Sequence, residues 1–134
     1  MIDAADFAEL QQVVWLYTHA IDDRRFSRAN EVFTEDATVD FSDVGGGICI
    51  GLPAIKEFWR RTLSTEVIHL ASNIVVDLRE DGTVDMLSRA LVSTVGGAIS
   101  NVAYTDIACR TDKGWRIRHR HIAVRVNAPT VPES

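Results

Sequence analysis

Cysteine is scarce in this sequence, which contains only two, Cys49 and Cys109. Two cysteines are too few for a disulfide framework, and their spacing matches no Cys-x-x-Cys metal or redox motif. Thiols of this kind are typical of a cytoplasmic protein, which is the location that we expect. No apolar run approaches the about 20 residues of a membrane-spanning helix, and the N-terminal residues MIDAADFAEL lack the basic start of a secretory signal. We therefore expect no membrane partner.

Positive charge is also in short supply, because 14 lysines and arginines face 19 aspartates and glutamates, for a formal net charge of −5. Nucleic-acid binding requires a clustered cationic surface, so we expect no nucleic-acid partner. The chain of 134 residues has the length of one domain, and 46% hydrophobic residues suit a single globular core. We expect one domain over residues 1–127 and a mobile C-terminal tail over 128–134, where proline and polar residues gather.

Apolar residues at helical spacing predict three helices in the first half of the chain. Short second and third helices are expected over 26–33 and 51–63, with a short strand over 37–42 between them. The first helix lies at the N-terminus and has an apolar stripe made of Phe7, Leu10, Val14, Tyr17 and Ile21.

The second half alternates between apolar and polar residues and predicts long strands near 66–79, 83–95, 98–111 and 114–126. Short turn sequences join them, namely REDG, GG and TDKG, so consecutive strands are expected to pair antiparallel. Helices followed by a run of strands predict an α+β domain, in which three helices pack on one face of a curved, mostly antiparallel sheet.

The strand over 66–79 has two unlike faces. One face is mixed, because His69 and Asn73 lie on it among apolar residues, and the helices are expected to close over it and leave a pocket. The other face then needs a cover, which a second copy of the chain would supply, so we expect a homodimer. That apolar face consists of Ile68, Leu70, Ile74, Val76 and Leu78.

His69 is the strongest candidate for a reacting group, because an imidazole takes up or releases a proton near neutral pH. A carboxylate from the end of the first helix, Asp22 or Asp23, could orient its ring and leave the second ring nitrogen for a substrate. The alternative is a structural histidine that bonds to the backbone or to Asn73. No serine or cysteine lies in a recognisable nucleophile motif.

Several polar residues follow in the last two strands. Asp106 is a carboxylate in an otherwise apolar strand. Alternation predicts that Arg116, Arg118 and Arg120 share one face, either as a solvated edge or with one arginine anchoring a polar group of a ligand. His119 and His121 have a spacing that could bind a metal, but no third ligand is evident, so we expect no metal site.

Four stretches together resemble the SnoaL-like branch of the nuclear transport factor 2-like superfamily, over residues 7–122. They are YTHAIDDRRFSRANEVFTEDATVDF, GLPAIKEFWRR, VIHLASN and GWRIRHR. The resemblance implies a cone in which three helices wrap a strongly curved sheet around a deep apolar cavity, often in a dimer. It also implies that Tyr17, Asp22 and His69 match catalytic residues of dehydratase members, such as those acting on bile acids or scytalone, and that Arg120 is a cavity residue.

This resemblance implies a lyase without a cofactor, which eliminates a leaving group from an apolar cyclic small molecule. His69 would be the general base, Asp22 would orient it, and Tyr17 would donate a hydrogen bond to a substrate oxygen. Asp106 and Arg120 would bind the substrate.

Two alternatives remain open. The same cavity suits a non-catalytic binding protein or an accessory subunit, since this fold hosts enzymes and non-enzymes alike. A ketosteroid-isomerase-like activity is the other, because Tyr17 and Asp106 match the hydrogen-bonding pair of that branch. The position of its aspartate base, however, is occupied by Phe41, with Asp40 beside it.

Overall fold

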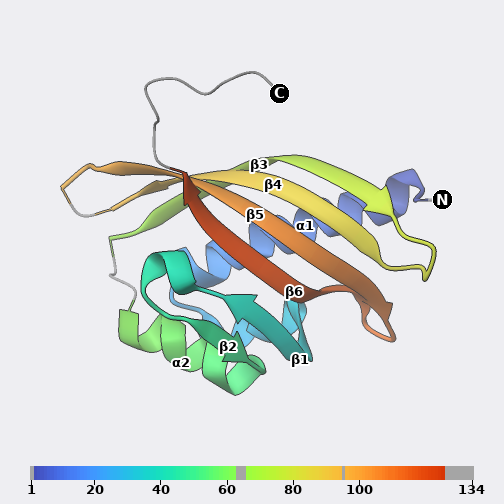
Figure 1. The fold of residues 1–134 in the computed structure, drawn as a ribbon, viewed down its shortest axis with the longest axis horizontal. Coiled ribbons are helices and arrows are strands. Elements are labelled where there is room, and N and C mark those ends of the chain that lie inside the picture. The colour runs from blue at the N-terminus through green and yellow to red at the C-terminus, as the bar shows by residue number, and fades with distance from the viewer. Residues whose placement is uncertain (1, 63–65, 95, 126–134) are drawn as a thin grey trace.

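The structure is a computed structural model that describes residues 2–62, 66–94 and 96–125 (Figure 1). Its elements follow in the order α1 (Ala4–Asp22), the 3-10 helix η1 (Phe26–Glu31), β1 (Phe33–Asp40), the 3-10 turn η2 (Ser42–Val44), β2 (Ile48–Ile50), α2 (Leu52–Thr62), β3 (Ile68–Leu78), β4 (Val84–Ser93), β5 (Ile99–Thr111) and β6 (Gly114–Arg125). The expected domain boundary after residue 127 and the expected tail over 128–134 lie outside the described residues. Among the helices that are described, none has the length and apolar character needed to cross a membrane.

One six-stranded sheet joins all the strands in the order β2-β1-β6-β5-β4-β3. Every pair is antiparallel except β1 with β6, which run parallel. Figure 1 shows a strongly curved sheet with α1 lying across it and α2 beside β1 and β2. The predicted α+β class, with helices packed on a curved and mostly antiparallel sheet, is confirmed.

Helix α1 begins with a capping box, in which the Asp3 carboxylate accepts a hydrogen bond from the Asp6 backbone N–H at 2.8 Å. The Asp6 carboxylate in turn accepts from the Trp115 indole N–H at 3.0 Å and so ties the start of the helix to β6. Near its end, Trp15 Nε1 donates to the Ala71 carbonyl oxygen at 3.0 Å. These contacts tie α1 to β6 and to the edge strand β3, and its predicted stripe is buried from Leu10 onward.

The prediction of a helix over 26–33 is wrong at its C-terminal end. A 3-10 helix ends at Glu31, and Phe33 begins β1, which is longer than the predicted strand over 37–42. The backbone N–H of Ile117 donates to the Val32 carbonyl oxygen at 2.8 Å, and Phe33 is in register with Ile117. Pairing with β6 therefore overrides the local helical spacing, a tertiary effect that propensity alone does not contain. Strand β2 was not predicted.

A bulge in β3 corrects the predicted faces of that strand. The register with β4 shifts between Ser72 and Val75, and Asn73 has a left-handed backbone with a φ of 55°. His69 and Ala71 face the helices as predicted, but beyond the bulge Ile74 joins them on the inner side. Asn73 itself is exposed, so it shares no pocket with His69.

Candidate active site

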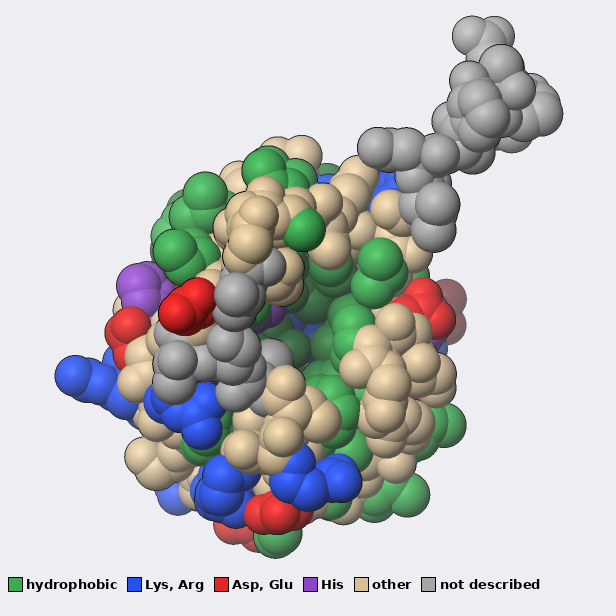
Figure 2. Space-filling view, turned by 90° about the vertical axis from the view of Figure 1, so that its left-hand side faces the viewer, with side chains coloured by type: hydrophobic (Ala, Val, Ile, Leu, Met, Phe, Trp, Pro, Cys, Tyr) green, Lys and Arg blue, Asp and Glu red, His purple; other side chains and the backbone are tan. Residues whose placement is uncertain are grey.

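The helices and the inner face of the sheet enclose a cavity of about 210 Å³. Figure 2 shows the hollow that leads into it, with hydrophobic side chains on its walls. Most of the lining is apolar and comes from both helices and from the strands β3, β5 and β6. The lining residues that the structure describes include no carboxylate, lysine or arginine. Their polar side chains are those of Tyr17, Trp59, Thr62, His69, Thr94, Ser100 and Tyr104.

The structure brings Asp22 and His69 together at the edge of this cavity. Asp22 Oδ1 lies 2.6 Å from His69 Nδ1, and Asp22 Oδ2 accepts a hydrogen bond from the His69 backbone N–H at 2.8 Å. An ionised carboxylate only accepts hydrogen bonds, so the proton lies on Nδ1 and the lone pair of the neutral ring lies on Nε2. Since His69 lines the cavity, Nε2 is the nitrogen available to a bound molecule.

The end of α1 decides which of two neighbouring aspartates meets the histidine. Asp22 is the last helical residue, whereas Asp23 caps the helix and turns its carboxylate toward His19, 3.8 Å away at Nδ1. The side chains of His69 and Asp22 are only 9% and 18% exposed. A charge-assisted hydrogen bond between groups this shielded is stronger than one at the surface.

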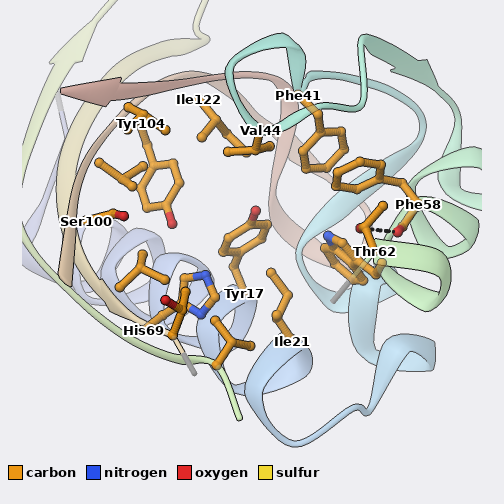
Figure 3. Close-up of a pocket in the computed structure, with 16 residues that line it drawn as sticks. Tyr17, Ile21, Phe41, Val44, Phe58, Thr62, His69, Ser100, Tyr104 and Ile122 are labelled. Carbon is orange, nitrogen blue, oxygen red and sulfur yellow. Dashed lines mark hydrogen bonds between the residues drawn. The ribbon is translucent and has the colours of Figure 1, made fainter. Parts of the chain in front are cut away.

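Tyr17 projects from the middle of α1 into the same cavity, and Figure 3 shows its hydroxyl directed into the open space. Its ring packs edge-on against Phe33, Trp59 and Tyr104 at centroid distances of 5.6–5.9 Å. Burial raises the pKa of Tyr17 to about 12, although the positive charge of Arg120 opposes this effect. Tyr17 is therefore a neutral hydrogen-bond donor throughout the physiological range of pH.

Asp106 and Arg120, predicted to bind the substrate, instead bind each other. Arg120 Nε and Nη2 donate to the two carboxylate oxygens of Asp106 at 2.7 and 2.8 Å, and both side chains are fully buried. Neither residue is among those that line the cavity. Although burial opposes a charged guanidinium, the Asp106 carboxylate keeps the pKa of Arg120 above its ordinary value. The guanidinium lies against the rings of Tyr17 and Tyr104, with its Cζ 4.3 and 4.1 Å from their centroids.

Tyr104 is a cavity residue that the sequence did not single out. It lies on β5, two residues before Asp106 and therefore on the same inner face. Its hydroxyl points into the cavity in Figure 3, and burial raises its pKa. Its shared face with the polar Asp106 was the available signal, but a tyrosine in an apolar strand is ordinary core composition.

The prediction that Arg116, Arg118 and Arg120 share one face of β6 is wrong. The register between β5 and β6 shifts beside Ile117, which leaves Arg118 exposed and turns Arg120 inward. His119 and His121 lie on the outer side, where His119 Nδ1 is 2.6 Å from the Thr38 hydroxyl. Within the described ranges, no group of three or more histidine, cysteine, aspartate or glutamate side chains is arranged to hold a metal ion.

The sequence of this chain matches the model of the SnoaL-like domain over residues 3–121. An uncharacterised protein of Mycobacterium tuberculosis is 33% identical to it over 129 residues, which cover 88% of this chain and 84% of that protein. The family match extends over the elements that build the cavity, from α1 into β6.

Two solved structures illustrate how far the fold is shared. A type 2 hexachlorocyclohexane dehydrochlorinase (LinA) is 18% identical and has a TM-score of 0.77, covering 95% of this chain and 90% of its own. A candidate scytalone dehydratase from Novosphingobium aromaticivorans is 17% identical and has a TM-score of 0.78, with coverage of 97% and 91%. At these identities the similarity concerns the fold.

The buried ion pair generates the first prediction. Replacing one partner leaves the other as an uncompensated charge in the core, so Asp106→Asn should lower the free energy of unfolding by about 3–5 kcal/mol. Urea denaturation followed by circular dichroism measures this change. The control is Glu57→Gln, which breaks the exposed pair with Arg60 and should cost no more than about 1 kcal/mol. Equal losses of unfolding free energy in the two variants would contradict the inference that Asp106 compensates a buried charge.

Proposed function

Because this chain belongs to the SnoaL-like domain family, we propose that it is a lyase that works without a cofactor. It eliminates a leaving group from an apolar cyclic small molecule bound in the cavity. The observation that carries the proposal is the Asp22–His69 pair, whose Nε2 has no hydrogen-bond partner among the described residues, at the wall of a mainly apolar cavity. A base oriented by a carboxylate is what abstraction of a proton from carbon requires.

In the proposed reaction, His69 Nε2 removes a proton from a substrate carbon. The electrons of the broken C–H bond form a C=C double bond, and the group on the adjacent carbon leaves with its bonding electrons. A leaving hydroxide takes the proton back from the imidazolium and departs as water, whereas a halide departs as the anion and the imidazolium then releases its proton to solvent water. Asp22 stabilises the imidazolium between the two steps, because its carboxylate lies 2.6 Å from Nδ1.

The size and polarity of the cavity define the substrate class. An apolar cavity of about 150 Å³ holds benzene, so about 210 Å³ suits a compound built on one ring. Charged side chains are absent from the described lining, and an ionic group of a substrate would lose its hydration without gaining a partner. An uncharged ring compound is therefore the favoured substrate.

The geometry favours elimination over a ketosteroid-isomerase-like activity. The Asp40 carboxylate accepts hydrogen bonds from the backbone and hydroxyl of Ser42 at 2.9 and 2.5 Å, and Asp40 is not a lining residue. Both oxygens of Asp106 accept from Arg120, so this residue offers no acidic proton to a substrate. Phe41 occupies the position of the aspartate base of ketosteroid isomerases, and its apolar side chain is part of the cavity wall.

Substitution of the histidine tests the proposal most simply. We expect the purified protein to release chloride from hexachlorocyclohexane, a one-ring compound named in a structural neighbour. His69→Gln should then lower kcat by about two to four orders of magnitude, because a general base usually contributes this much to the rate. Asp22→Asn should lower it as well, whereas Asp23→Asn is the matched control.

Turnover of the His69→Gln variant close to that of the wild type would rule out His69 as the general base. Tight binding of this compound without turnover by the wild type would instead favour the binding-protein alternative. Quenching of tryptophan fluorescence reports such binding, because Trp59 lines the cavity.

We also propose that the protein is a homodimer through the outer face of the sheet. Apolar residues on the two neighbouring strands β3 and β4 are more than half exposed there, and Leu70 on β3 is in register with Leu91 on β4. An exposed apolar patch of this kind marks an interface, and a second copy presents the same patch. The patch consists of Ile68, Leu70, Val75, Leu87 and Leu91.

A charge placed in this patch tests the dimer. Leu70→Glu with Leu91→Glu should shift the mass measured by sedimentation equilibrium from two chains to one, because each copy would bury unpaired carboxylates. Ile50→Glu on β2, at the opposite edge of the sheet, is an equally exposed control and should leave the mass unchanged. A wild-type protein that sediments as one chain contradicts the proposal.

A further inference from the structure

Two side chains of α1 hold the outer edge of β3, and one of them lies outside the Asp22–His69 pair. β3 is the last strand in the order of the described sheet, so α1 rather than another strand meets this edge. Asp22 Oδ2 accepts from the His69 backbone N–H at 2.8 Å, and Trp15 Nε1 donates to the Ala71 carbonyl oxygen at 3.0 Å. At these two residues, α1 takes the place of a neighbouring strand.

The spacing along both elements allows the two contacts to form together. Trp15 and Asp22 are seven residues apart, which is about two helical turns and brings them to the same side of α1. His69 and Ala71 are two residues apart, so their backbone groups point to the same edge of β3. Two contact points on each element fix how far β3 is shifted along α1, whereas one contact would leave the strand free to pivot.

The part of β3 that carries His69 depends on such a contact because it is short. Its register with β4 runs unbroken from Ile68 to Ser72 and shifts before Val75. The bulge uncouples this part from the remainder of the strand. A slip of one residue would turn His69 to the opposite face of the sheet. Trp15 holds Ala71, which lies directly before this irregular stretch.

Trp15 itself is separate from the cavity. It is not among the residues that line the cavity, and it is 41% exposed in a groove that α1 and β3 form. Asp22 and His69 border the same groove. Trp15 therefore acts on His69 through the backbone of β3 and not through a bound molecule.

We propose that Trp15 is a positioning residue of this site. Its indole N–H fixes β3 against α1, so that the two oxygens of Asp22 meet the ring and the backbone of His69 at once. The displacement that matters is small, because a shift of about 1 Å in a reacting group can lower a rate about 100-fold. The effect on turnover rests on the proposed elimination, whereas the effect on the hydrogen bonds of His69 does not.

The substitution Trp15→Phe tests this role, because it keeps an aromatic ring and removes the indole N–H. We expect the backbone N–H of His69 to exchange with deuterium about 10-fold faster, as for a lost hydrogen bond. Nitrogen-15 NMR should show a weaker preference of the neutral ring for a proton on Nδ1. The kcat for release of chloride from hexachlorocyclohexane should fall about 10- to 100-fold with KM nearly unchanged, because the cavity wall is intact.

The matched control is Trp115→Phe. Trp115 Nε1 also donates at 3.0 Å, to the Asp6 carboxylate, and ties the opposite end of α1 to β6. The control therefore removes the same atoms and the same kind of bond from the same helix. It should lower the temperature of thermal unfolding, but hydrogen exchange at His69, the protonation of its ring and kcat should stay as in the wild type.

The outcomes separate this role from general stability and from the proposed function. Wild-type exchange and ring protonation of His69 in Trp15→Phe would overturn the positioning role, whatever the turnover. Equal changes at His69 in both tryptophan variants would also overturn it, since a general loss of stability would then explain them. A wild type without turnover would count against the elimination, but a change at His69 confined to Trp15→Phe would still support the positioning role.

Discussion

The hydrogen bond between Asp22 and His69 is the interaction on which the account depends. It joins the last residue of α1 to the second residue of β3 and, with the hydrogen bond from Trp15 to Ala71, holds the helix against this strand of the cavity wall. One carboxylate fixes both the backbone and the ring of the histidine. The same contact therefore positions the strand, selects the tautomer and leaves Nε2 toward the cavity.

A second polar group, the buried Asp106–Arg120 pair, lies against two tyrosine rings of the cavity wall. Arg120 and Asp106 neutralise each other out of contact with the cavity, and the guanidinium supports the rings of Tyr17 and Tyr104. The cavity thus offers a hydrogen-bond acceptor at His69 and donors at the two tyrosines, within a mainly apolar wall. The acceptor and the donors thus come from separate elements around one cavity.

The sequence reveals some of these features more readily than others. Turn residues and alternation predicted the antiparallel sheet, and the polar His69 in an apolar strand indicated a candidate site. The choice of Asp22 over Asp23 depends on where a helix ends, which periodicity locates only within a residue or two. Bulges at Asn73 and beside Arg120 reverse the faces of two strands, and nothing local in the sequence marks them. Nothing in the sequence marks Tyr104 as a cavity residue except the face that it shares with Asp106.

The protonation of the His69 ring tests the central claim most directly. Nitrogen-15 NMR of the wild-type protein at a pH where His69 is neutral distinguishes a protonated ring nitrogen from one with a free lone pair. We expect the proton on Nδ1 and the lone pair on Nε2, with this preference lost in Asp22→Asn. A proton on Nε2, or the same spectrum in both proteins, would contradict the account.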